Sequence, residues 1–111
     1  MPRPAIERRR SPRYLCSQIV EVRRQQPDAD PAPATAVLED LSAEGAGVAV
    51  EAPMAVGQSI ELVTPGLQAP AKVRYCLARE NDFRLGLEFC DGHRWDLGRW
   101  QPGHLFLPPA E

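Results

Sequence analysis

The sequence is poor in the side chains from which metal centres and disulfide frameworks are built. Its three cysteines, Cys16, Cys76 and Cys90, are scattered and form no Cys-x-x-Cys pair, so we interpret them as small hydrophobic residues on strands. The two histidines, His93 and His104, lie near the C-terminus in no HxH or HExxH spacing. We therefore expect neither a bound metal nor a cofactor.

Motifs of catalysis and of membrane insertion are missing as well. The sequence has no GxSxG, GxGxxG or Walker pattern, and Ser42 lacks the neighbours of a nucleophile. No apolar run approaches the roughly 18–20 residues of a membrane span. Residues 1–14 have no apolar stretch typical of a signal peptide. We expect a cytoplasmic protein that is not an enzyme.

Charge is distributed unevenly along the chain. Residues 1–24 hold seven arginines against two glutamates, a net charge of +5, and the remainder carries −7. A basic segment on an acidic body favours a local anion site, with a solvated basic tail as the alternative. A barrel that binds single-stranded nucleic acid needs exposed aromatics on a basic face. Only 6% of the residues in this chain are aromatic, which makes nucleic-acid binding the less favoured alternative.

Short strands account for most of the sequence. In the clearest of them, residues 82–89, four apolar side chains alternate with Arg84, Gly86 and Glu88, the pattern of a half-buried strand. Residues 25–34 are rich in proline and aspartate and predict a loop. The other predicted strands cover residues 14–24, 35–41, 47–51, 58–64 and 69–78. Six short strands with little helical periodicity predict an all-β antiparallel barrel or sandwich.

The C-terminal tail, residues 91–111, has a different pattern. Residues 93–100 predict one or two helical turns, and prolines at 102, 108 and 109 prevent a longer helix. We expect the apolar side chains of the tail to cover an open end of the barrel, with binding of a partner as the alternative. These side chains are Trp95, Trp100, Leu105 and Phe106.

An RxxxR pattern, Arg9 to Arg13, is the first of two motifs that suggest binding chemistry, and Arg8 precedes it. In an extended chain, residues four apart point the same way and lie roughly 13 Å apart. Pro12 disfavours a helix here. Guanidinium groups form paired hydrogen bonds both with phosphate oxygens and with the O6/N7 edge of guanine, so the pattern suits a ligand that carries both.

The second motif is the DxSxxG of residues 40–45. The Asp40 carboxylate is able to accept hydrogen bonds from guanine N1 and N2, and Ser42 is both donor and acceptor. Gly45 permits a positive φ or close backbone approach. The alternative is a hairpin turn in which Asp40 and Ser42 bond their own backbone.

The two motifs, in this order and followed by strands, resemble the PilZ domain family over about residues 7–89. The resemblance implies a six-stranded antiparallel β-barrel of a bacterial second-messenger receptor that binds cyclic di-GMP. It also implies that Arg9 and Arg13 contact phosphates and guanine edges. The opposing wall would then be formed by Asp40, Ser42 and Gly45. In this family an arginine just before RxxxR goes with a bound, intercalated pair of ligands, and Arg8 holds that position.

The expected organisation is a flexible basic switch segment (1–13), a barrel (14–90) and a tail packed on it (91–111). Ligand binding would order the switch segment and signal to a protein partner whose identity the sequence does not give. One alternative is an adaptor of the same fold that binds no nucleotide. A less favoured one is a small barrel that binds single-stranded nucleic acid.

Overall fold

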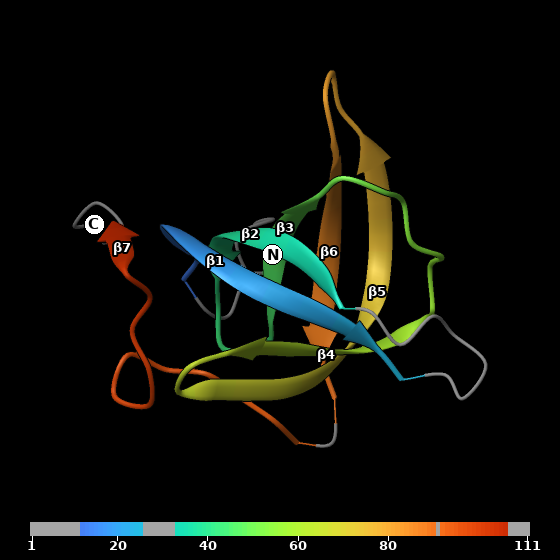
Figure 1. Ribbon diagram of the computed structural model, residues 1–111. Coiled ribbons are helices and arrows are strands. Elements are labelled where there is room, and N and C mark those ends of the chain that lie inside the picture. The colour runs from blue at the N-terminus through green and yellow to red at the C-terminus, as the bar shows by residue number, and fades with distance from the viewer. Residues whose placement is uncertain (1–11, 26–32, 91, 107–111) are drawn as a thin grey trace, which may run out of the picture.

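The computed structural model describes residues 12–25, 33–90 and 92–106, which form β-strands and turns and contain no helix (Figure 1). None of these residues therefore belongs to a helix long and apolar enough to cross a membrane. The basic segment up to residue 11 and most of the predicted loop, residues 26–32, lie outside the described residues. The strands are β1 (Tyr14–Arg24), β2 (Ala34–Leu41), β3 (Gly45–Val50), β4 (Ser59–Thr64), β5 (Leu67–Ala78), β6 (Phe83–Phe89) and β7 (His104–Phe106).

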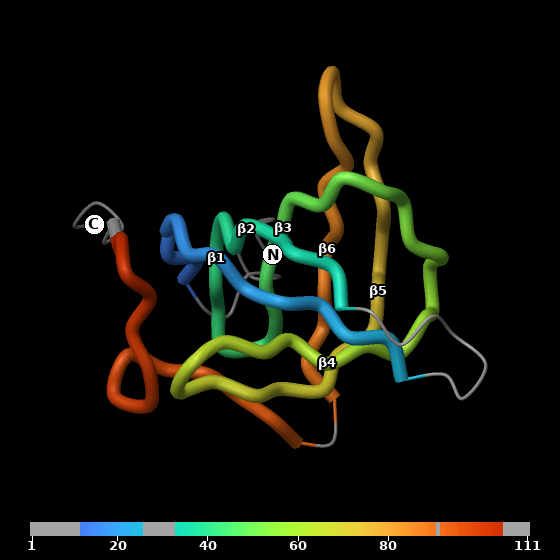
Figure 2. The backbone as a smooth tube through the Cα atoms, viewed as in Figure 1, coloured from blue at the N-terminus to red at the C-terminus, as the bar shows by residue number. Residues whose placement is uncertain are grey.

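Six strands close into an antiparallel barrel in the order β1-β2-β3-β6-β5-β4. The six-stranded antiparallel barrel that the resemblance implied is confirmed. Closure depends on β1, whose 11 residues pair along one edge with β2 and along the other with β4. The β5–β6 hairpin extends beyond the barrel and turns at residues 79–82 (Figure 1, Figure 2).

Alternating apolar side chains from all six strands fill the barrel. On β6, Leu85 and Leu87 are buried while Glu88 is exposed, which confirms the predicted alternation. The core includes Val20, Val22, Leu38, Val48, Ile60, Leu62 and Val73. Burial of these side chains is the main force that holds the barrel closed.

Strand starts differ from the predictions by one or two residues. β3 begins at Gly45 rather than 47, and β5 begins at Leu67 rather than 69. The β5 difference follows from a tight turn, in which Thr64 pairs with Leu67 across Pro65 and Gly66. Gly66 has a φ of 87°, a conformation that favours glycine, so pairing resumes at once.

The predicted helical turns at residues 93–100 are wrong, because this segment forms hydrogen bonds that compete with a helix. Oδ1 of Asp96 accepts from the backbone N–H groups of Gly98 (2.8 Å) and Arg99 (3.1 Å), a local turn that aspartate commonly makes. The backbone N–H of Trp95 donates to the carbonyl of Ala43 at 3.2 Å, across the barrel rather than along the segment.

The tail adds a seventh strand that the sequence analysis missed. β7 pairs with the start of β1, where Leu105 faces Cys16 in register. Leu105 packs against the core, and Trp95 is only 3% exposed within it. The Trp95 ring also makes an edge contact with Tyr14, with centroids 5.5 Å apart. Side chains of the tail thus complete the barrel core.

Candidate functional site

The DxSxxG residues form the turn between β2 and β3. Asp40 is the last but one residue of β2, and Gly45 begins β3. The backbone N–H of Ser42 donates to the carbonyl of Gly45 at 2.9 Å, and its hydroxyl donates to the same oxygen at 3.4 Å. Ser42 therefore closes the hairpin, as the structural alternative for this motif predicted.

Gly45 is required by close packing between β3 and β6. A Cβ atom at this position would lie 2.0 Å from the backbone oxygen of Leu87, which no real contact allows. Gly45 is not among the described glycines with a positive φ. Of the two reasons for glycine that the sequence analysis offered, close backbone approach is the one that applies.

Asp40 does not bond its own backbone but pairs with Arg84 of β6. Nη2 of Arg84 donates to Oδ2 of Asp40 at 2.6 Å, and Nη1 donates to Oε1 of Glu39 at 2.9 Å. Space for the guanidinium comes from Gly47, where a Cβ would lie 2.2 Å from Nη2. The sequence analysis missed Arg84, although it placed this residue on the polar face of β6.

The first strand brings residue 13 to the same turn. In the β1–β2 register, Tyr14 faces Leu41 and Leu15 faces Asp40. Arg13 immediately precedes this pairing and is exposed. The end of the RxxxR motif therefore runs into the barrel beside the DxSxxG turn, whereas Arg8 and Arg9 lie outside the described residues.

A family model of the PilZ domain matches residues 7–96. The chain belongs to the PilZ domain family. The PilZ match confirms the resemblance and extends it past β6 to include Trp95. The PilZ family is in general a family of cyclic di-GMP receptors, and its domains are typically non-catalytic. No curated protein matches this PilZ chain.

The surroundings of Asp40 in this PilZ barrel form a network of alternating charge. Arg79, at the base of the β5–β6 turn, donates to Glu39 at 3.0 Å and to Asp82 at 2.7 Å. The hydrogen bond from Arg79 lowers the pKa of Asp82. Burial lowers the pKa of Arg84, but its hydrogen bonds to Asp40 and Tyr75 and the nearby charge of Asp40 together outweigh burial, so the net pKa is raised. Both guanidinium groups thus remain charged.

Asp40 also acts on the interior of the PilZ barrel. Burial first, and then the negative charge of Asp40, raises the pKa of the Cys16 thiol to about 11. Cys16 lies on β1 and Cys76 on β5, as predicted, but Cys90 comes just after β6, so its predicted strand position is wrong. Among the described residues, no group of three or more potential ligands is placed to hold a metal ion.

The tail of the PilZ domain and the end of β6 both contact the DxSxxG turn. The carbonyl of Ala43 accepts from Trp95, and the carbonyl of Glu44 accepts from the backbone N–H of Phe89 at 2.8 Å. The Glu44 carboxylate pairs with Arg94 at 3.3 Å. The turn is therefore held at both of its central residues, Ala43 and Glu44.

Proposed function

We propose that this PilZ protein is a cytoplasmic receptor for cyclic di-GMP. Its ligand would lie between the arginines of the N-terminal segment and the DxSxxG turn. The phosphates and guanine edges would be contacted by Arg8, Arg9 and Arg13. The opposing wall would be Asp40, Ser42 and Gly45.

The observation that carries this proposal is the β1–β2 register. Pairing of Tyr14 with Leu41 fixes the point where the RxxxR motif meets the barrel. A ligand bound to the turn is therefore within reach of a guanidinium at position 13. Arg13, the described end of the RxxxR motif, thus enters the barrel next to the DxSxxG turn, which supports a two-sided site.

The Asp40–Arg84 pair gives the proposed guanine contact a physical basis. Arg84 takes one carboxylate oxygen, Oδ2, and so fixes the orientation of the group. The other oxygen, Oδ1, is then preorganised to accept from N1 or N2 of a guanine. A carboxylate that is already held loses little conformational entropy when the ligand binds.

Ligand binding would fix the arginine segment against the barrel and so change the surface that a partner protein meets. Arg8 would stack on a guanine face and offset the charge of a second, intercalated cyclic di-GMP. We therefore expect two ligands per chain.

A series of arginine variants tests the proposal by calorimetry. Arg9→Ala and Arg13→Ala each remove a charge-assisted contact worth roughly 1.5–3 kcal/mol, so affinity falls about ten- to a hundredfold. Arg8→Ala lowers the stoichiometry from two toward one. Arg23→Ala, an exposed arginine paired with Glu21, is the matched control and leaves binding unchanged. Equal small losses in the variants of Arg8, Arg9 and Arg13 would reduce the segment to a diffuse basic tail.

One observation favours a second candidate, a PilZ adaptor that binds no nucleotide. Asp40 already has a cationic partner in Arg84, so the turn is stable without a ligand. The two candidates are separated by the same titration: an adaptor is folded and monodisperse but gives no heat with cyclic di-GMP.

A further inference from the structure

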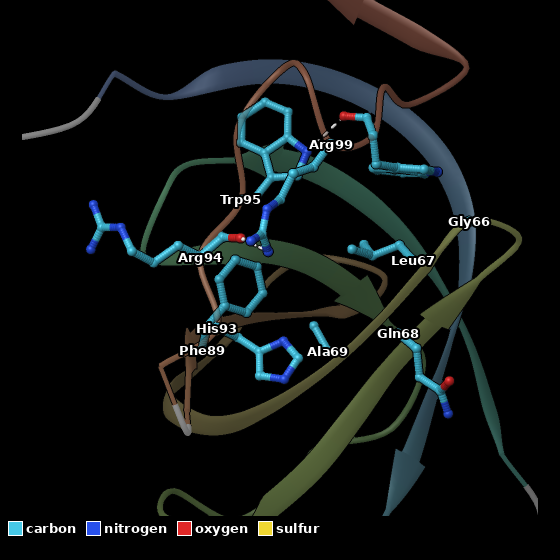
Figure 3. A pocket seen from close by; sticks show the side chains of 10 residues that line it. Gly66, Leu67, Gln68, Ala69, Phe89, His93, Arg94, Trp95 and Arg99 are labelled. Atoms are coloured by element: carbon cyan, nitrogen blue, oxygen red, sulfur yellow. Dashed lines mark hydrogen bonds between the residues drawn. The ribbon is translucent and has the colours of Figure 1, made fainter.

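A pocket of about 340 Å³ lies between the β4–β5 turn and the C-terminal turns (Figure 3). Its volume is near the lower end of the range for ligand sites in proteins, which suits one or two side chains better than a dinucleotide. The described residues that line it include Leu67, Phe89, His93, Trp95, Arg99 and Trp100.

One part of the pocket walls is apolar. Nε1 of Trp95 donates to the carbonyl of Trp100 at 2.7 Å, and Nε1 of Trp100 donates to the carbonyl of Pro65 at 3.0 Å. Because both indole N–H groups are satisfied by the backbone, the rings have no polar atom left to offer and line the pocket as apolar surfaces. Leu67 and Phe89 complete these walls.

One guanidinium is directed into this apolar surround. Figure 3 shows Arg99 turned inward near Trp95 and Phe89, whereas the side chain of Arg94 points away. Nη1 of Arg99 donates to the carbonyl of Arg94 at 3.0 Å, which fixes the group. A guanidinium has five N–H donors, so this single bond leaves several for an incoming carboxylate.

The charge of the lining has one sign. His93, Arg94 and Arg99 contribute basic groups, and none of the described lining residues is acidic. The nearby Glu44 pairs with Arg94 and Asp96 caps its own turn, so neither of these interactions involves the Arg99 side chain. An occupant complementary to this pocket combines an apolar group with a carboxylate.

We propose that this pocket docks a segment of a partner protein in which an apolar side chain stands beside a carboxylate. The apolar side chain fills the space against Trp95 and Trp100, and the carboxylate binds Arg99. The pocket adjoins the DxSxxG turn through the Trp95 bond to Ala43. The identity of this partner as a signalling target rests on the proposed receptor function, but docking itself does not.

Tryptophan fluorescence reports on this pocket, because the chain has two tryptophans and both line it. The probe is the peptide acetyl-Ser-Glu-Leu-Glu-Ser-amide, titrated without nucleotide. Its uncharged analogue, with Gln for both Glu, binds roughly three- to fivefold more weakly, as for exposed ion pairs. The analogue with Ser for Leu binds about tenfold more weakly or worse. Equal affinity of the three peptides overturns the proposal.

Variants of the protein test whether the preference for the acidic peptide depends on the Arg99 side chain. Arg99→Gln removes the preference for the acidic peptide over its uncharged analogue, and Arg99→Lys restores most of it. Arg23→Gln, which makes the same charge change at an exposed residue of β1, keeps the full preference. An unchanged preference in Arg99→Gln contradicts the proposal. Failure of cyclic di-GMP to bind the same preparation would instead refute the receptor function and leave the docking site standing.

Discussion

The ion pair between Arg84 and Asp40 allows a quantitative prediction. The two charged groups are 2.6 Å apart, and their side chains are 19% and 11% exposed. Arg84→Met keeps much of the apolar stem but leaves the carboxylate without its cation. Removing one partner of a fully buried pair costs about 3–5 kcal/mol. Because this pair keeps some contact with water, we expect a loss of about 2–3 kcal/mol in the free energy of unfolding.

A double-mutant cycle in urea measures the pairwise part of this loss. The cycle uses Arg84→Met, Asp40→Asn and the double variant. The contact between Arg84 and Glu39 is lost both in Arg84→Met and in the double variant, so its energy cancels from the coupling. We expect a coupling energy of about 1.5–3 kcal/mol. The matched control is the Arg74–Glu88 pair, whose side chains are 61% and 53% exposed, with an expected coupling below about 1 kcal/mol.

A coupling at Arg84 and Asp40 no larger than that of the control pair would refute this reasoning. It would mean that water already satisfies the Asp40 carboxylate. Arg84 would then have no part in orienting Asp40 toward a ligand. A large coupling together with unchanged nucleotide affinity in Arg84→Met would confine the pair to a structural role.

Three further predictions concern single residues. Arg10→Ala, between the two motif arginines, weakens cyclic di-GMP binding by at most a few fold in calorimetry; a loss as large as that of Arg13→Ala would show that the motif register is wrong. Gly45→Ala destabilises the fold by about 1–3 kcal/mol in urea, because its Cβ would lie 2.0 Å from Leu87 O; a change below about 0.5 kcal/mol would contradict the packing argument. Cys16 has a folded-state pKa of about 11 against 9.0 for a free thiol. The contribution of the protonated thiol to the free energy of unfolding is therefore fully present below pH 9 and is lost as the pH rises toward 11. Between pH 9 and pH 11 the free energy of unfolding of the wild type should therefore fall by up to about 2–3 kcal/mol more than that of Cys16→Ala. Equal falls would exclude a role for the thiol.

The barrel strands could be predicted because each of them has a recognisable local sequence pattern. β1 was predicted at the residues it occupies, and β6 was identified from four alternating apolar side chains. The turn at Ser42 was also predictable, because serine and glycine favour hairpin turns wherever they flank strands. Short-range spacing determines all of these features.

Features set by tertiary contacts could not be predicted in this way. β7 has three residues, too few for a periodic pattern, and exists because it pairs with β1. The segment 93–100, predicted to be helical, is instead joined to the barrel by a bond from the Trp95 N–H to the Ala43 carbonyl, about fifty residues away in the sequence. The Arg84–Asp40 pair likewise joins two strands that only the closed barrel brings together.

The most direct test of the receptor function is calorimetric titration of the purified chain with cyclic di-GMP and, in parallel, with cyclic di-AMP. Reading of a guanine edge by Asp40 and an arginine discriminates against adenine by about 1–3 kcal/mol for each contacted base. We predict that cyclic di-GMP binds at least about tenfold more tightly, with two ligands per chain. Equal affinity for the two dinucleotides, or no heat from cyclic di-GMP in a folded sample, would contradict the account.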